Sequence, residues 1–270
     1  MKYERIFFIP GDESVYIDAY VADEVRTPLR DAMIIFPGGA YRAVCADREG
    51  EPIALAYLSR GVNSFVVKYS VGETIKFPRQ LLDAARAFVY VKEHYEEFHI
   101  NPDRMFVSGF SAGGHLAGSL AVMHAYAEEL LGYDKDYCKC RGAVLAYPVV
   151  SGHQPTHVGS LEHLYAKPYE EITEEERTRV SLELNITEET PPMFIWHTAL
   201  DQLVPPHGAI NLARAYCDLG RSVCFHLYPY GKHGAALAND VTDIYPDQVC
   251  HTHPEAKNWL DDSREWMRTV

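Results

Sequence analysis

Residues 104–120 constrain the fold of this 270-residue chain more than any other stretch, because a short apolar run, a G-x-S-x-G and a helix of small residues follow one another there. The apolar run occupies residues 105–107, and residues 109–113 read GFSAG. In such a segment a buried strand turns sharply into a helix, with glycines where a side chain would clash. The segment therefore predicts a strand–turn–helix elbow that presents the hydroxyl of Ser111 in front of the helix N-terminus.

Apolar runs alternate with helix-period patterns along most of the chain, and this alternation is typical of a parallel sheet with right-handed crossovers. Residues 6–9 and 15–21 instead alternate apolar and polar side chains, which predicts two antiparallel edge strands. We expect an α/β fold with a mostly parallel central sheet of about eight strands and helices on both faces. The absence of a repeat or linker favours a single domain over residues 1–270.

Residues 151–192 break the alternation. Apolar periodicity weakens there, and carboxylates and prolines crowd the segment. A connection of this length is typical of a lid or a pocket wall, so we predict an insertion over the C-terminal edge of the sheet. A solvated surface excursion is the alternative.

The charge balance excludes some classes of partner. The formal net charge is -13, and nucleic acid and anionic membrane surfaces would repel such a chain. The N-terminal residues show no signal-peptide pattern, no apolar stretch has the length of a membrane span, and the six cysteines form no C-x-x-C pair. These features predict a cytoplasmic protein that acts on a small molecule; a homo-oligomer is left open.

A serine hydroxyl needs a base within hydrogen-bond reach and a third group that orients the base. Asp201 lies in the short segment after the apolar run 193–196, and His233 lies in the short segment after the alternating run 223–227. Both therefore belong at C-terminal strand ends, on the same edge as Ser111 and in the chain order Ser, Asp, His. We expect them to be the acid and the base.

Three other histidines are rivals for the role of base. His197 precedes the acid, which predicts a structural role, and His226 lies inside a strand, which predicts a surface or packing role. His115 lies near Ser111 on the following helix, but it would have to point back over the nucleophile to act as base.

The run PGGAY at residues 37–41 follows another buried strand and supplies backbone N–H groups at its C-terminal end. Small residues let an acyl group approach the backbone, so we expect Gly39 and Ala40, with Ala112 after the nucleophile, to bind the oxyanion of a tetrahedral intermediate. A plain turn is the alternative. Tyr41 and Tyr69, at neighbouring strand ends, are candidate substrate contacts, with packing as the alternative.

Four motifs together resemble the α/β-hydrolase esterases of the acetyl esterase and acetyl-xylan-esterase-like group: PGGAY at 37–41, GFSAGGHLA at 109–117, WHTALDQLVP at 196–205 and GKHG at 231–234. The resemblance implies Ser111 as nucleophile, Asp201 as acid, His233 as base, and hydrolysis of short acyl esters, often acetyl groups on sugars. One departure concerns the oxyanion loop. Related lipases and esterases carry His-Gly-Gly-Gly, whereas Pro37 and Ala40 stand at the first and last of those positions here.

The predicted reaction is a two-step acyl transfer that needs no metal or organic cofactor. The scattered histidines, including those at 251 and 253, lack the matching ligands of a zinc site. Three alternatives remain open: an arylformamidase-type amidase, a small serine peptidase, and a catalytically inactive binding module on the same scaffold.

Overall fold

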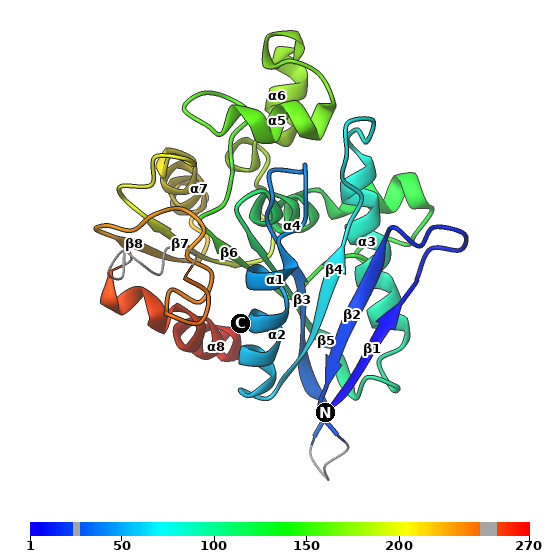
Figure 1. The fold of residues 1–270 in the computed structure, drawn as a ribbon. Helices are drawn as coiled ribbons and strands as arrows, with labels where there is room; N and C mark the ends of the chain where they lie inside the picture. Colours follow the sequence, from blue (N-terminus) through cyan, green and yellow to red (C-terminus); the bar gives the residue numbers. More distant parts are fainter. Residues whose placement is uncertain (24–27, 244–252) are drawn as a thin grey trace.

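The computed structural model describes residues 1–23, 28–243 and 253–270 (Figure 1). One eight-stranded sheet runs through them in the order β1-β2-β4-β3-β5-β6-β7-β8. The first two strands and β4 pair antiparallel, and the neighbours from β4 to β8 pair parallel. The predicted mostly parallel sheet is confirmed, with these strands: β1 Lys2–Ile6, β2 Tyr16–Val21, β3 Arg30–Phe36, β4 Val62–Lys68, β5 Ile100–Phe110, β6 Gly142–Ala146, β7 Met193–Thr198 and β8 Val223–Tyr228.

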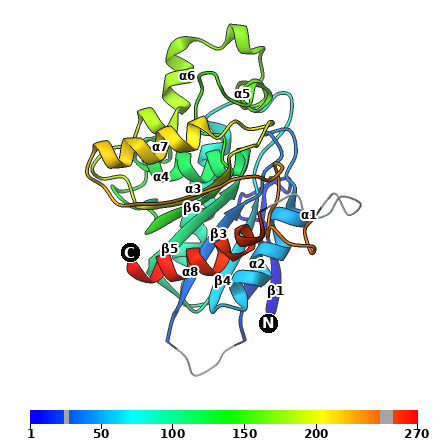
Figure 2. The ribbon, with the colours of Figure 1, turned by 90° about the vertical axis from the view of Figure 1, so that its left-hand side faces the viewer.

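Helices cover both faces of the sheet (Figure 2). One face carries α3 Arg79–Glu93, α4 Ala112–Leu131 and α7 His207–Asp218, and the other carries α1 Ala46–Glu49, α2 Glu51–Leu58 and α8 Trp259–Thr269. A strand between two helical layers buries both its faces, so its sequence is continuously apolar. In β3, Ile34 packs into the first core, and Met33 and Ile35 pack into the second.

The strand β5 is longer than its apolar run. Asn101, Pro102 and Asp103 precede that run and lie inside Ile100–Phe110. The pairing with β3 jumps from Arg30↔Ile100 to Ala32↔Met105 at this point. A proline cannot donate to the ladder, and this irregular register accommodates it.

A 3-10 helix precedes the C-terminal α-helix. The 3-10 helix η3 spans Pro254–Asn258, and α8 follows it. Trp259 and Met267 of α8 are fully buried in the second core, as the amphipathic pattern predicts. Among the residues that the structure describes, no helix combines the length and apolar character needed to cross a membrane.

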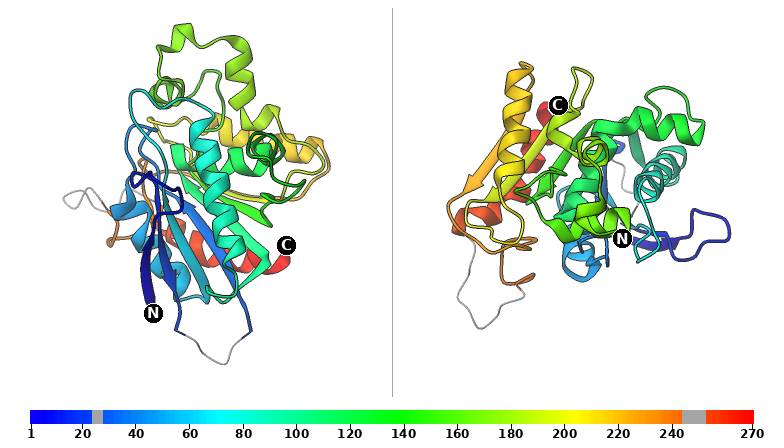
Figure 3. Two further views of the ribbon diagram at one scale, coloured as in Figure 1. Left: turned by 90° about the vertical axis from the view of Figure 1, so that its right-hand side faces the viewer. Right: turned by 90° about the horizontal axis from the view of Figure 1, so that it is seen from above.

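The insertion 151–192 is partly helical, and it lies beyond the carboxyl ends of the parallel strands (Figure 3). It contains α5 Val158–Tyr165, η1 Tyr169–Glu171, α6 Glu174–Val180 and η2 Leu182–Leu184. Backbone hydrogen bonds fasten it to the rest of the chain: Phe77 N–H donates to Leu164 O at 2.8 Å, Leu182 N–H donates to Val150 O at 3.0 Å, and Ala143 N–H donates to Pro192 O at 3.1 Å. Movement of the insertion as a lid stays a prediction.

Candidate active site

The turn between β5 and α4 has the geometry of a nucleophile elbow. Ser111 precedes the first residue of α4 and has a φ of 54°, a left-handed conformation that is unusual for serine. The two glycines of the motif are needed because backbone atoms lie too close to them to leave room for a side chain. A Cβ on Gly109 would lie 2.0 Å from Gly113 O, and one on Gly113 would lie 2.1 Å from Phe36 O. The sequence prediction of a strained elbow agrees with this geometry.

The three residues from different strand ends meet at this elbow. His233 Nε2 lies 2.8 Å from Ser111 Oγ, and His233 Nδ1 lies 2.6 Å from Asp201 Oδ2. The side chain of Asp201 is fully buried and that of His233 is 12% exposed. Nδ1–H therefore donates to the carboxylate, which leaves Nε2 to accept the serine proton.

The carboxylate of Asp201 is held on both oxygens. Its Oδ1 accepts the backbone N–H groups of Leu203 and Val204 at 2.9 and 3.0 Å. Burial alone would raise the pKa of Asp201, but hydrogen bonds from His197 and His233 outweigh burial and hold the pKa of this carboxyl below its usual range. Asp201 is therefore ionised at neutral pH and fixes the orientation of the imidazole.

Two of the rival histidines, His115 and His226, bind other groups. His115 is buried, with Nδ1 accepting the Tyr41 hydroxyl at 2.7 Å and Nε2 donating to Val180 O at 2.8 Å. Burial lowers the pKa of His115 to about 4, so it is a neutral structural link. His226 is half-buried on β8, where its Nε2 lies 3.3 Å from Cys224 Sγ.

The loop after β3 lies against the elbow. Gly38 N–H donates to Glu49 Oε2 at 2.8 Å, and Gly39 O accepts the N–H groups of Arg42 and Ala43, both at 3.0 Å. In the part of the chain that the structure describes, no hydrogen bond engages the N–H groups of the three expected oxyanion donors, Gly39, Ala40 and Ala112. They are thus available to a ligand, and Gly39, with a φ of 129°, adopts a conformation that favours glycine.

Tyr41 and Tyr69 do not offer a surface to substrate, and this expectation is corrected. Their exposed fractions are 1% and 0%. The Tyr41 hydroxyl is hydrogen-bonded to His115, and the Tyr69 hydroxyl donates to Pro37 O at 2.7 Å. The two rings pack edge to face, with their centroids 6.1 Å apart. The ring of Tyr69 thus packs against the loop that carries Tyr41. An aromatic residue at a strand end is compatible with either role, and here packing prevails.

Comparison with known proteins decides the family. The family model BD-FAE matches residues 17–216. The chain belongs to the BD-FAE family. A curated relative, endo-1,4-beta-xylanase B of Butyrivibrio fibrisolvens, is 34% identical over 226 residues, which are 81% of this chain and 34% of the relative. The chain spans 30% to 58% of the length of the curated relatives it matches.

Solved structures show the fold that this BD-FAE family member adopts. MGS-M1, an alpha/beta hydrolase enzyme from a Medee basin deep-sea metagenome library, is 32% identical with a TM-score of 0.79, and the match covers 100% of this chain and 97% of that one. The acetyl ester-xyloside bifunctional hydrolase from Caldicellulosiruptor lactoaceticus is 29% identical with a TM-score of 0.82, covering 98% and 96%. The predicted α/β-hydrolase fold is therefore confirmed.

Sequence reasoning missed two buried polar residues next to the candidate active site, Glu49 and Tyr147. Glu49 is 1% exposed, and its Oε1 accepts the Tyr147 hydroxyl at 2.8 Å. The Tyr147 ring packs edge to face on His233, with centroids 5.0 Å apart. The one signal in the sequence was the position of Tyr147 at the end of an apolar run, directly before Pro148.

The insertion and a surface hollow flank the base. His157 lies within electrostatic range of His233 and Asp201, and burial holds the pKa of His157 below its usual value. A hollow of about 540 Å³ opens beside His233, and two side chains that line it are largely exposed, Leu200 at 65% and Tyr230 at 44%. The hollow gives a substrate room next to the base.

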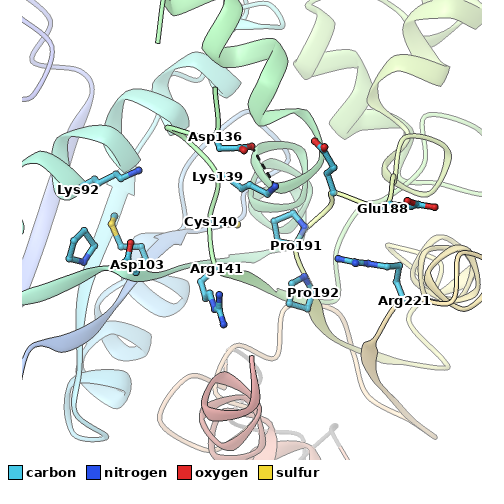
Figure 4. Close-up of a pocket in the computed structure, with 13 residues that line it drawn as sticks. Lys92, Asp103, Asp136, Lys139, Cys140, Arg141, Glu188, Pro191, Pro192 and Arg221 are labelled. Carbon is cyan, nitrogen blue, oxygen red and sulfur yellow. Dashed lines mark ion pairs between the residues drawn. The ribbon is translucent and has the colours of Figure 1, made fainter. Parts of the chain in front are cut away.

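A second hollow of about 540 Å³ lies at the opposite edge of the sheet, where the parallel strands begin (Figure 4). None of Ser111, Asp201 and His233 lines it. Its charges are mixed in sign, and one ion pair spans 3.4 Å between Lys139 and Asp136. It is therefore separate from the cluster of Ser111, Asp201 and His233.

Metal ligands were not expected, and the described residues contain no group of three His, Cys, Asp or Glu side chains placed to hold an ion. The sequence positions Cys250 and His251 lie outside the described residues.

Proposed function

We propose that this protein is a serine esterase that hydrolyses short acyl esters, acetyl groups on sugars above all, through an acyl-enzyme on Ser111. The observation that carries the proposal is the continuous hydrogen-bonded relay, 2.6 Å from Asp201 to His233 and 2.8 Å from His233 to Ser111. Such a relay activates a hydroxyl that is otherwise a poor nucleophile near neutral pH.

In the first step His233 Nε2 removes the Ser111 proton while Oγ attacks the ester carbonyl. The N–H groups of Gly39, Ala40 and Ala112 bind the oxyanion of the tetrahedral intermediate. His233 then gives its proton to the alcohol, which leaves. Water attacks the acyl-enzyme by the same path and releases the acid. Asp201 stays ionised throughout, because its pKa lies below the usual range.

Two observations support an acetylated sugar as substrate. A relative of 29% identity that matches nearly its whole length is described as an acetyl ester-xyloside bifunctional hydrolase. The hollow beside His233 presents the half-exposed ring of Tyr230, on which a sugar can stack. We therefore place the alcohol part of the ester in this hollow, a role that Tyr41 and Tyr69 are too buried to serve.

The experiment compares hydrolysis of p-nitrophenyl esters of increasing chain length with release of acetate from a panel of acetylated xylose oligomers. The proposal expects turnover to be highest for acetyl and to fall with chain length. N-formylkynurenine is the competing amide. If it were turned over faster than every ester, the amidase alternative would replace the esterase.

We also propose that the protein acts in the cytoplasm, which is a reducing compartment. The described cysteines, 45, 138, 140, 217 and 224, are all free thiols, and free thiols are usual where thiols are kept reduced.

A further inference from the structure

A buried hydrogen-bonded chain connects the two loops that flank Ser111. Gly38 N–H donates to Glu49 Oε2 at 2.8 Å, and the Tyr147 hydroxyl donates to Glu49 Oε1 at 2.8 Å. The same hydroxyl oxygen accepts Ala236 N–H at 2.9 Å. The chain therefore runs from the loop after β3, next to the oxyanion donor Gly39, to the loop that follows His233.

This chain of hydrogen bonds is closed to solvent and tightly packed. Glu49 and Tyr147 are each 1% exposed. A Cβ on Gly38 would lie 2.7 Å from Glu49 Oε2 and 3.0 Å from Ser111 Cβ, so Gly38 packs closely between the carboxylate and the elbow. Burial raises the pKa of Tyr147 well above its usual value. Its hydroxyl therefore stays protonated and donates a hydrogen bond to Glu49.

The backbone at Tyr147 is unusual as well. Its φ is 36°, in the left-handed region that a bulky side chain rarely adopts, and it directly follows the last residue of β6. Such a conformation persists only where its surroundings over-determine it. Here the hydroxyl is fixed by Glu49 and Ala236, and the ring is fixed against Trp196 and His233 at 5.0 Å each.

A second tie runs parallel to the first. Arg48, the neighbour of Glu49 on α1, donates from Nη1 to Gly234 O at 2.9 Å. Two consecutive residues of one four-residue helix thus hold the residues after His233, one directly and one through Tyr147. Nothing in the mechanism above uses either of them.

We propose that Glu49 and Tyr147 are positioning residues that hold the oxyanion loop and the His233 loop in mutual register. This inference rests on the proposed function. The oxyanion donors and the base must act on one substrate at once, and a displacement of about 1 Å between them costs on the order of a hundredfold in rate. Because the two residues act on the transition state rather than on ground-state binding, their loss lowers kcat and leaves KM nearly unchanged.

The test uses Tyr147→Phe and Glu49→Gln in the full chain, with Tyr57→Phe as the matched control. Tyr57 is also fully buried, and its hydroxyl contacts Ser263 Oγ at 2.9 Å on the second core, away from the site. Kinetics with p-nitrophenyl acetate are measured beside the affinity for phenylboronic acid, a tetrahedral mimic, and beside thermal unfolding. Tyr147→Phe carries the test alone if Glu49→Gln does not fold.

Tyr147→Phe is expected to lower kcat at least about tenfold and to change KM by less than about twofold. The affinity for phenylboronic acid should fall by about the same factor as kcat. Its melting temperature should change as little as that of Tyr57→Phe. The double variant should lose no more than the worse single one, because both changes break one chain. A kcat equal to that of Tyr57→Phe, or losses that multiply in the double variant, overturns the inference. If Ser111→Ala were as active as wild type, the proposed function itself would fall, and this inference with it.

Discussion

His197 Nε2 lies 3.4 Å from Asp201 Oδ2, the same carboxylate oxygen that binds His233 Nδ1 at 2.6 Å. The same His197 nitrogen lies 3.0 Å from Val204 O, so its proton is shared between that carbonyl and the carboxylate. His197 is completely buried. A histidine at the end of β7 thus serves the structural role that its position ahead of the acid predicts, as part of the surroundings that keep Asp201 ionised.

Replacing His197 tests this support. His197→Phe keeps the ring but removes the donor, and a hydrogen bond to a charged group contributes about 1.5–3 kcal/mol. We expect kcat to fall about tenfold with KM nearly unchanged, because the carboxylate that orients His233 loses one of its donors. His226→Phe, a change on the neighbouring strand, is the control. A kcat equal to that of His226→Phe would contradict the role given to His197.

The oxyanion loop can be tested through Gly39. A Cβ there would lie 2.2 Å from Ala43 O, at a φ of 129°, so Gly39→Ala must displace the loop. We expect kcat to fall about a hundredfold with a small change in KM, since removing one oxyanion donor costs about that much. Gly61→Ala is the control, because Gly61 also has a positive φ, of 80°, but no atom within 4 Å of its added Cβ. Equal kinetics for the two variants would refute the assignment.

The pH dependence of stability should report on His115. Its pKa of about 4 in the fold lies below the usual value of 6.5, so the unfolded chain binds more protons between these values. The free energy of unfolding must therefore fall as pH drops from 6.5 to 4, by up to about 3 kcal/mol from this residue. Tyr41 is the titratable group that faces it. When the free energy of unfolding is measured with urea at pH values from 7.5 to 4.5, it should fall less steeply with pH in His115→Asn than in wild type. Equal falls in the two proteins would contradict a buried neutral histidine.

Substrate stacking on Tyr230 gives a separate expectation. Tyr230→Ala should raise KM for acetylated xylose oligomers about threefold to tenfold, as an aromatic contact of about 0.5–1.5 kcal/mol implies. The KM for p-nitrophenyl acetate, which has no sugar, should change less. Tyr3→Ala removes a similarly exposed tyrosine from the far edge strand and should change neither. A uniform effect on both substrates would show that the ring does not read the sugar.

The sequence was sufficient where function depends on local pattern. The elbow needs glycines at fixed positions around Ser111, and Asp201 and His233 follow strands whose carboxyl ends must share an edge. It was insufficient where partners are distant. Glu49 meets Tyr147 across 98 positions, and Tyr147 meets Ala236 across 89. Helix α1, which carries Glu49, has only four residues, too few to show a helical period. Exposure was also undetermined, which is why buried Tyr41 was taken for a substrate contact.

The most direct test of the central claim is mass spectrometry of the intact protein and its peptides after treatment with a fluorophosphonate, run beside p-nitrophenyl acetate turnover. The account predicts a single adduct on the peptide that contains Ser111, much slower labelling in His233→Ala, and neither adduct nor turnover in Ser111→Ala. Full turnover in Ser111→Ala, or an adduct on another residue with Ser111 unmodified, would contradict it.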